Sequence, residues 1–196
     1  VVIVGSGAGG DVTAELLSAA GLDVIIVEEG PLKKSSDFKM LESEAYPALY
    51  QDSASRQTAD KAIKILQGRC VGGSTTVNWT SSFRTPPATL QWWQTAHGLK
   101  NLSVDAMAPW FAAMEQRLHV GLWPLPPNDN NAALARGAAQ LGIPVAVIPR
   151  NVKMCWNLGY CGLGCPTNAK QSMLVTTIPG ALEQGVLSLR RFCGAR

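Results

Sequence analysis

The chain has 196 residues, of which 46% are hydrophobic and 16% are charged, a composition typical of a globular protein with one ordinary core. Basic residues exceed acidic ones by three and form no run, so the charge gives no reason to expect nucleic acid or an anionic membrane as a partner. No apolar stretch reaches the ~18 residues that a transmembrane segment needs.

The first predicted elements form a strand, a glycine loop, a helix and a second strand. An apolar run over 1–4 precedes Gly5, Gly7 and Gly10, which have the GxGxxG spacing, and a second apolar run over 24–27 follows the helix. Gly21 stands where a left-handed C-cap would close the helix. We expect one apolar face on this helix, made of Val12, Leu16, Ala19 and Ala20.

Each residue of this pattern has a physical role in binding a dinucleotide. Gly5 permits the tight turn, Gly7 lets the backbone approach a pyrophosphate, and Gly10 lets the helix pack closely on the strand. The helix N-terminus directs free N–H groups at the phosphates. Glu28 lies 18 residues after Gly10, at the end of the second strand, where its carboxylate can accept hydrogen bonds from a ribose. An acid here disfavours NADP and leaves NAD and FAD open; a purely structural strand-to-helix turn is the alternative.

A second glycine loop follows at RCVGGSTTVNWT, residues 69–80. The apolar residues over 63–66 suggest a strand that leads into Gly68. Gly72 and Gly73 then interrupt regular structure, and backbone without side chains can lie against a planar ligand or a phosphate. The hydroxyl groups over 74–76 can donate to phosphate or ring oxygens. The alternative is a glycine-rich corner with no ligand, packed by a tryptophan.

These motifs together resemble a known family. VVIVGSGAGG, then IIVEEG, then GRCVGGSTTVNWTSSFRTP is similar to the N-terminal FAD-binding half of the glucose-methanol-choline (GMC) oxidoreductases, and the resemblance spans most of the chain. It implies an α/β fold, with an FAD-binding Rossmann-like βαβ domain over 1–88 and a partial, mainly helical cap or substrate region over 89–196. Because the chain opens inside an apolar run at Val1 and ends at Arg196 without a closing element, we expect it to be truncated.

The resemblance also implies the cofactor-binding residues. In the family the first loop holds the FAD pyrophosphate, the acid holds the adenosine ribose, and the second loop runs beside the pyrophosphate and the isoalloxazine. The residues expected to bind FAD are Gly5, Ser6, Gly7, Ala8, Gly9, Gly10, Glu28, Arg69, Gly72, Gly73, Ser74, Asn78, Trp79 and Thr80. Some relatives attach FAD covalently through a histidine where this sequence has Val77, so we expect a non-covalent flavin.

The pattern in the middle of the chain predicts short helices joined by proline-rich loops. Pro109 is expected at the first position of a helix that runs to about Leu118, with its apolar side chains in a core. WPLPPND, residues 123–129, predicts a loop, and a second helix is expected over 132–141, closed by Gly142.

Three cysteines lie together in CWNLGYCGLGCP: Cys155, Cys161 and Cys165. The spacing fits no common zinc pattern, and we assign no metal ligand. The stretch resembles the cysteine-rich insert of iron–sulfur flavoprotein dehydrogenase subunits, although the first gap departs from that pattern by one residue. A structural loop with free thiols or one disulfide is favoured, and an iron–sulfur cluster is the alternative.

The resemblance implies oxidation of a CH–OH group (alcohol, sugar or sterol-like) to a carbonyl by hydride transfer to the flavin. Such a reaction needs a base to remove the hydroxyl proton. In the family this base is a histidine in the C-terminal half; His97 and His119 do not match its position, so we name no catalytic residue and expect the base to lie outside this chain, which would be inactive alone. A small-molecule alcohol is the expected substrate, and the electron acceptor (oxygen, a quinone or a carrier protein) stays open. A flavoprotein subunit that passes electrons to an iron–sulfur cluster and a non-catalytic nucleotide-binding module are the alternatives.

Overall fold

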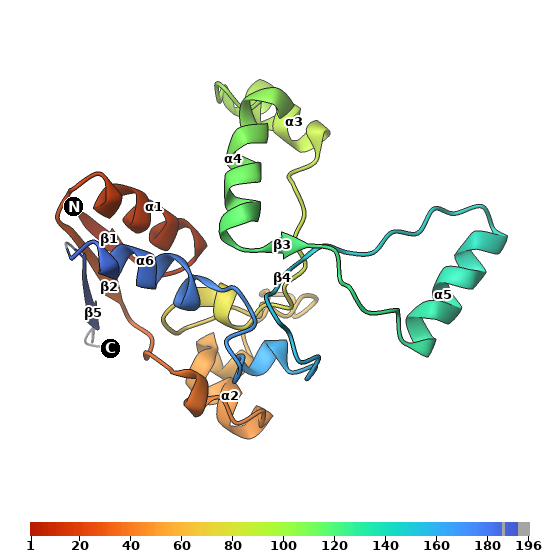
Figure 1. The fold of residues 1–196 in the computed structure, drawn as a ribbon, viewed down its shortest axis with the longest axis horizontal. Coiled ribbons are helices and arrows are strands. Elements are labelled where there is room, and N and C mark those ends of the chain that lie inside the picture. The colour runs from red at the N-terminus through yellow and green to blue at the C-terminus, as the bar shows by residue number, and fades with distance from the viewer. Residues whose placement is uncertain (186, 192–196) are drawn as a thin grey trace. The chain divides into compact units, whose positions relative to one another are not determined.

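The computed structural model describes residues 1–185 and 187–191, and the chain divides into two compact units. The first unit consists of residues 1–80 and the described residues from 152 onward, and the second unit of residues 81–151 (Figure 1). The functional domains expected over 1–88 and 89–196 stay predictions, because compact units report packing only.

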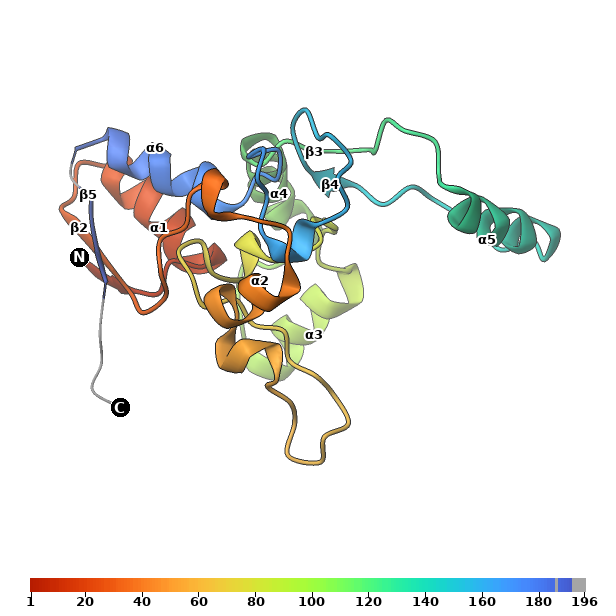
Figure 2. The same ribbon diagram turned by 90° about the horizontal axis from the view of Figure 1, so that it is seen from below.

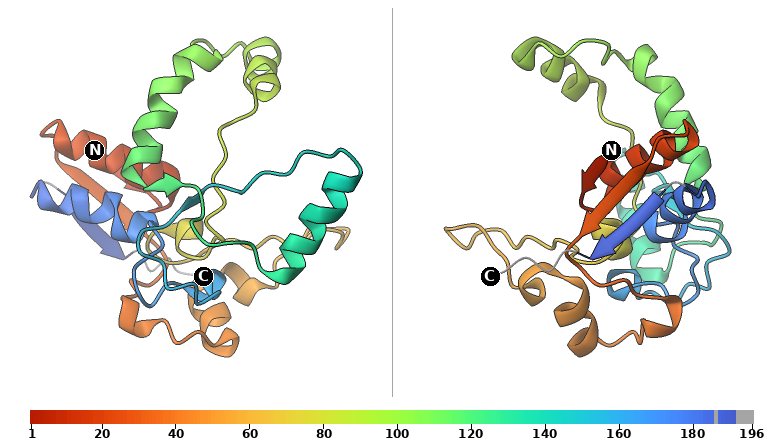
Figure 3. Two further views of the ribbon diagram at one scale, coloured as in Figure 1. Left: turned by 45° about the vertical axis from the view of Figure 1, so that its right-hand side comes forward. Right: turned by 90° about the vertical axis from the view of Figure 1, so that its left-hand side faces the viewer.

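A three-stranded parallel sheet is the centre of the first unit, and it confirms the predicted βαβ start. The strands run in the order β1-β2-β5, with bounds Val2–Val4, Val24–Glu28 and Leu187–Arg191. The register pairs Val2 with Ile25 and Val24 with Leu187, and β2 and β5 can be followed side by side in Figure 3.

Helices α1 (Ala8–Ala19) and α6 (Thr177–Glu183) cover one face of this sheet (Figure 2). Side chains on β2 alternate: Val24 and Ile26 are buried against Ala14 of α1 and Ala181 of α6, whereas Ile25 is 41% exposed. A strand sends successive side chains to opposite faces, so this alternation shows that the helices cover the Val24 and Ile26 face.

The predicted apolar face of α1 is wrong. The buried residues of the helix are Asp11, Ala14 and Ser18, whereas Leu16 is 62% exposed; Ala19 and Ala20 are exposed and Val12 is half-buried. The helix begins in very close contact with the sheet at Gly10, and small side chains suit so close an approach. Gly21 adopts φ +79° and closes the helix as predicted.

The remainder of the first unit consists of short helical turns around a second core. These are η1 (Ser35–Asp37), α2 (Glu42–Leu49), η2 (Gln51–Ala54), η3 (Gly73–Thr76), η4 (Cys161–Leu163) and η5 (Met173–Val175). The core contains Phe38, Ala45, Leu49, Tyr50, Cys70, Val77 and Leu163. The strand predicted over 63–66 is wrong: only isolated bridges occur there, Gln57 with Lys64 and Tyr50 with Gly68. Its apolar side chains are 40–63% exposed and have no sheet to pack against.

The second unit contains α3 (Pro87–His97), α4 (Val104–Arg117), α5 (Asp129–Gln140) and a short antiparallel pair, β3 (Val120–Gly121) with β4 (Arg150–Asn151). The predicted start of α4 at Pro109 is wrong, because Ser103 caps the helix by accepting a hydrogen bond from the Ala106 N–H at 3.1 Å, and Pro109 lies inside it. Asn128 caps α5 in the same way, and Gly142 adopts φ +68° just beyond it. The side chains of Phe111, Met114 and Leu118 are half-buried.

Within the described ranges, no helix combines the length and the apolar character needed to cross a bilayer.

Candidate functional site

The first glycine loop presents an open backbone surface at the start of α1. A Cβ built on Gly5, Gly7 or Gly9 would meet no atom within 4 Å. Gly7 is the N-cap and contributes no side chain, so nothing of this residue covers the N–H groups of the first helical turn. Bare N–H groups at a helix N-terminus attract anions, and the geometry therefore fits the pyrophosphate of a dinucleotide.

The third glycine of the pattern is required by packing. A Cβ on Gly10 would overlap the carbonyl oxygen of Gly5 and would lie 3.2 Å from Cγ2 of Ile3. This residue therefore sets the close approach of α1 to β1, as the sequence predicts.

Ser6 joins the first glycine loop to β2 and to the second glycine loop. Its backbone N–H and its hydroxyl both donate to Oε2 of Glu28, at 2.8 and 2.7 Å. The Ser6 hydroxyl oxygen accepts a hydrogen bond from the Gly72 N–H at 3.1 Å. Ser6 is fully buried, so all three bonds are shielded from water. The Ser6 side chain thus connects the first glycine loop to the end of β2 and to the second glycine loop.

Glu28 is 6% exposed, and its second carboxylate oxygen, Oε1, accepts from the Gly30 N–H at 2.7 Å. The carboxylate therefore organises the loop at the end of β2. Each oxygen can accept more than one hydrogen bond, so the ribose contact expected of Glu28 stays compatible with this geometry and stays a prediction.

The two glycine loops meet directly. A Cβ on Gly73 would lie 2.8 Å from the Cα of Gly7, a distance that real Cβ atoms do not show, and Gly73 also has φ +54°. Gly72 has φ +87°, and a Cβ there would overlap Oγ1 of Thr76. Both residues must therefore be glycine for the second loop to reach the first.

The Ser6 hydrogen bonds give a prediction for Ser6→Ala. The substitution leaves the buried Gly72 N–H without its acceptor and removes one bond to Glu28, so the free energy of unfolding should fall by about 1–3 kcal/mol. Ser18→Ala is the matched control, because Ser18 is equally buried on α1 and its hydroxyl has no partner in the described chain. Urea unfolding curves measure both; equal stability of the two variants would contradict the role given to Ser6.

Asp11 was not predicted as a special residue, yet it is fully buried beside this site. Neither of its carboxylate oxygens has a hydrogen-bond partner within the described chain. Burial, and secondarily the charge of Glu28, raises the pKa of Asp11 to about 8. The side chain is therefore a neutral acid in the folded protein below that pH. Its aspartate identity is visible in the sequence, but its burial depends on where α1 packs.

The far end of the second glycine loop differs from its start in exposure. Asn78 is exposed and Trp79 is 59% exposed. Nearer the start of the loop, the Ser74 hydroxyl accepts a hydrogen bond from the Gly68 N–H at 3.0 Å. Thr80 is buried with φ +66°, which is a rare backbone conformation for a β-branched residue. Strained residues of this kind concentrate at binding sites. Arg69 lies at the start of the loop and pairs with Glu29 at 3.2 Å.

Sequence reasoning missed two buried polar residues that contact this loop. Lys170 is 2% exposed, and its ammonium group donates to the carbonyl oxygens of Thr76, Asn78 and Cys161. Tyr50 donates its hydroxyl proton to the carbonyl oxygen of Gly162 at 2.6 Å, and burial raises its pKa to about 12. Three of these four hydrogen bonds join residues more than 90 positions apart in the sequence, so no local pattern indicates them.

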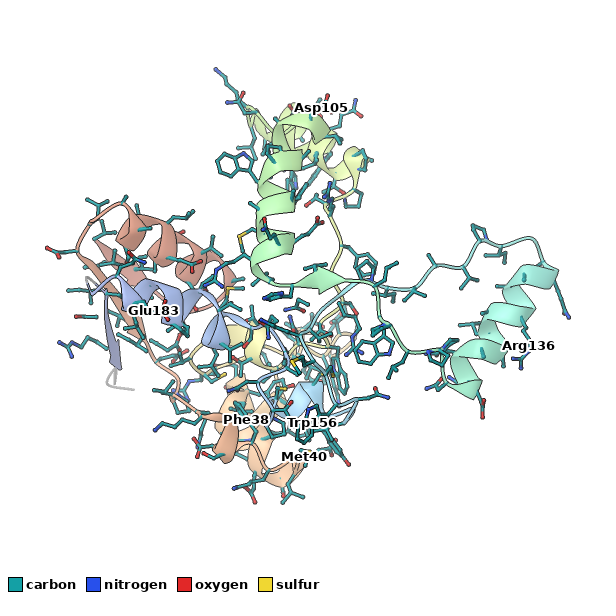
Figure 4. All side chains as sticks on the ribbon, viewed as in Figure 1. Phe38, Met40, Asp105, Arg136, Trp156 and Glu183 are labelled. Atoms are coloured by element: carbon teal, nitrogen blue, oxygen red, sulfur yellow. The ribbon has the colours of Figure 1, made fainter. Side chains whose placement is uncertain are left out.

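The cysteine loop, residues 155–165, packs under the second glycine loop. Phe38, labelled in Figure 4, fills the place where a Cβ on Gly164 would stand. Cys155, Cys161 and Cys165 are half-buried, and no disulfide joins them to one another. Burial alone would raise the pKa of Cys165, but hydrogen bonds from the Thr167 hydroxyl and the Lys170 backbone N–H outweigh it and lower the pKa.

Among the residues that the structure describes, no group of three or more His, Cys, Asp or Glu side chains is placed to hold a metal ion. The iron–sulfur alternative therefore stays a prediction from the sequence. His97 and His119 are both exposed and belong to the second unit.

The family model described as GMC oxidoreductase matches residues 46–195. The long-chain-alcohol oxidase FAO4A of Arabidopsis thaliana is 33% identical over 182 residues, which are 93% of this chain and 25% of that protein. An uncharacterized GMC-type oxidoreductase, y4nJ of Sinorhizobium fredii, is 34% identical over 191 residues, 97% of this chain and 38% of that protein. The chain thus spans between a quarter and two fifths of these relatives.

Two solved structures share the fold. Pyridoxine 4-oxidase from Mesorbium loti superposes with a TM-score of 0.66 at 20% identity, over 97% of this chain and 41% of that one. An FAD-dependent oxidoreductase from Chaetomium thermophilum superposes with a TM-score of 0.67 at 15% identity, over 96% and 37%.

Proposed function

Because the chain belongs to the GMC oxidoreductase family, we propose that it is the FAD-binding part of an enzyme that oxidises an alcohol to a carbonyl compound. The observation that carries the proposal is the direct meeting of the two glycine loops, where Gly73 lies against Gly7 and Gly72 donates to Ser6. A single βα turn suffices for a pyrophosphate, whereas two joined loops provide a longer cradle that suits a dinucleotide with a large planar ring.

Different segments of the chain bind different parts of FAD. The open N-terminus of α1 binds the diphosphate, Glu28 receives the ribose hydroxyls, and the second glycine loop lies along the ring system. When bound, the flavin supplies the acceptor for the hydride that leaves the alcohol carbon. The chain's own contribution is to bind and orient this group.

An alcohol is proposed as the substrate because relatives such as FAO4A are long-chain-alcohol oxidases at 33% identity. Removal of the hydroxyl proton needs a base within hydrogen-bonding distance of the substrate. The exposed His97 and His119 do not belong to the unit that carries the glycine loops, and we assign the base to a residue outside this chain.

FAD binding tests the proposal. Protein purified and incubated with FAD, then freed of excess cofactor, is expected to be yellow with a flavin absorption spectrum, and the same treatment with NAD should leave no bound nucleotide. Val77 is buried in the core and has no nucleophilic atom, so acid precipitation should release the flavin into the supernatant. A colourless protein would refute the proposal, and flavin retained in the precipitate would refute the non-covalent attachment.

A further inference from the structure

Lys170 makes a contact set that is unusual for a lysine. Its side chain is buried, and Nζ lies 2.6 Å from the Thr76 carbonyl oxygen, 2.9 Å from that of Asn78 and 2.6 Å from that of Cys161. An ammonium group has three N–H donors, and here each has a backbone acceptor. No carboxylate forms an ion pair with it in the described parts of the chain.

Such a charge is expensive to bury, so the contacts must compensate for lost hydration. Burial lowers the pKa of Lys170 to about 8, while the nearby Cys161, Cys165 and Cys70 thiols act in the opposite direction. Hydrogen bonds to a charged donor are worth about 1.5–3 kcal/mol each, roughly twice a neutral bond. The arrangement is therefore stable only while the carbonyls converge on the ammonium group.

The three acceptors belong to two different loops. Thr76 and Asn78 flank Val77 in the second glycine loop, and Cys161 is in the cysteine loop. Holding the first two carbonyls at one point turns the chain so that Val77 enters the core while Asn78 stays exposed. The exposed part of the loop is the part assigned to the flavin ring.

Two other contacts support the same junction. The Tyr50 hydroxyl holds the Gly162 carbonyl, next to Cys161. The Trp79 ring lies so close to Gly162 that a Cβ there would be 3.0 Å from Cζ2 of the indole. Lys170 therefore joins the cysteine loop to the second glycine loop by hydrogen bonds on either side of Val77, and the contact between Trp79 and Gly162 adds a direct aromatic contact between the two loops.

We propose that Lys170 is a positioning residue for the cofactor: its ammonium group fixes the backbone of residues 76–78 on the cysteine loop in the shape that receives the flavin ring. The proposal rests on the function proposed above, since it assumes that this loop binds FAD. It also gives the cysteine loop a role as the support of the cofactor site.

Lys170→Met tests the proposal, because methionine keeps the unbranched apolar part of the side chain, ends one atom short of the Nζ position and has no N–H donor. The expected result is FAD binding at least about tenfold weaker, measured as the dissociation constant by fluorescence titration. At saturating FAD the visible circular dichroism of the bound flavin should also change, which a loss of global stability would not produce. Lys153→Met is the matched control: Lys153 is an exposed lysine of the same unit, and FAD binding should stay as in the unchanged protein.

A second measurement needs no cofactor. In cofactor-free Lys170→Met, amide hydrogen exchange should accelerate over 74–80 and 161–165, while β1 and β2 keep their protection. If the unchanged protein binds no FAD, the proposed function fails and the exchange data still decide whether Lys170 holds the loops. Should Lys170→Met not fold, Lys170→Gln restores two N–H donors and is expected to bind FAD with intermediate affinity. Unchanged FAD affinity and unchanged dichroism in a folded variant would overturn the proposal.

Discussion

Gly10→Ala is expected to lower the free energy of unfolding by about 3 kcal/mol, whereas Gly9→Ala, one position earlier, should leave it unchanged or raise it by up to about 1 kcal/mol. The added methyl group at Gly10 would overlap the Gly5 carbonyl oxygen and contact Ile3, both of which belong to the strand and turn that α1 packs against. Backbone atoms cannot move aside as a side chain can, so α1 must shift away from the sheet.

At Gly9 the same methyl group meets nothing within 4 Å and adds helix propensity. The pair therefore separates steric overlap from any general effect of alanine in this helix. Urea unfolding followed by far-ultraviolet circular dichroism gives both free energies. If Gly10→Ala is as stable as Gly9→Ala, the close approach of α1 to β1 is wrong.

Asp11→Asn is expected to stabilise the protein at mildly alkaline pH by on the order of 5 kcal/mol, the second large effect. The folded-state pKa of Asp11 is raised from 3.8 to about 8, first by burial and then by Glu28. Because the pKa is raised on folding, the contribution of Asp11 protonation to the free energy of unfolding is fully present below pH 3.8 and is lost as the pH rises through about 8. Between these two pH values the folded protein holds a proton that the unfolded chain has released, and above about pH 8 it keeps a buried carboxylate that has no hydrogen-bond partner in the described chain.

Asparagine has nearly the same shape as aspartate and does not titrate, so the variant does not lose stability through this residue as the pH rises. Stability measured at about pH 5 and about pH 9 should fall much less for Asp11→Asn than for the unchanged protein; other titrating groups, including Lys170, cancel in the difference between them. Asp23→Asn, at an exposed position of the same unit, should show the pH dependence of the unchanged protein. Parallel pH curves for Asp11→Asn and the unchanged protein would show that Asp11 is not a buried neutral acid.

Sequence reasoning succeeded where a residue's role depends on its near neighbours. The order strand, glycine loop, helix, strand is visible in the sequence because Gly5, Gly7 and Gly10 all lie in the short connection from the strand to the helix. Gly21 and Gly142 end helices through their own positive φ angles. The strand suggested over 63–66 failed because alternating apolar residues say nothing about whether a partner strand exists.

The sequence predicted many of the residues of the site but not the hydrogen bonds that hold them together. Ser6, Gly72 and Glu28 were each expected to contact FAD, yet the sequence does not indicate that the Ser6 hydroxyl bonds to both of the others. Asp11 and Lys170 escaped prediction because lysine and aspartate are usually exposed, and only the packing of distant segments buries them.

The contacts of Lys170 also bear on the order in which the protein folds. Nζ reaches Thr76, 94 positions earlier in the chain, and β2 pairs with β5, whose first residue is Leu187. Contacts between such distant segments form late, because the entropy of closing a long loop is lost before the contact is gained. During synthesis, residues 5–10 and 69–80 therefore leave the ribosome early but reach their final shape only after Lys170 and β5 have been made.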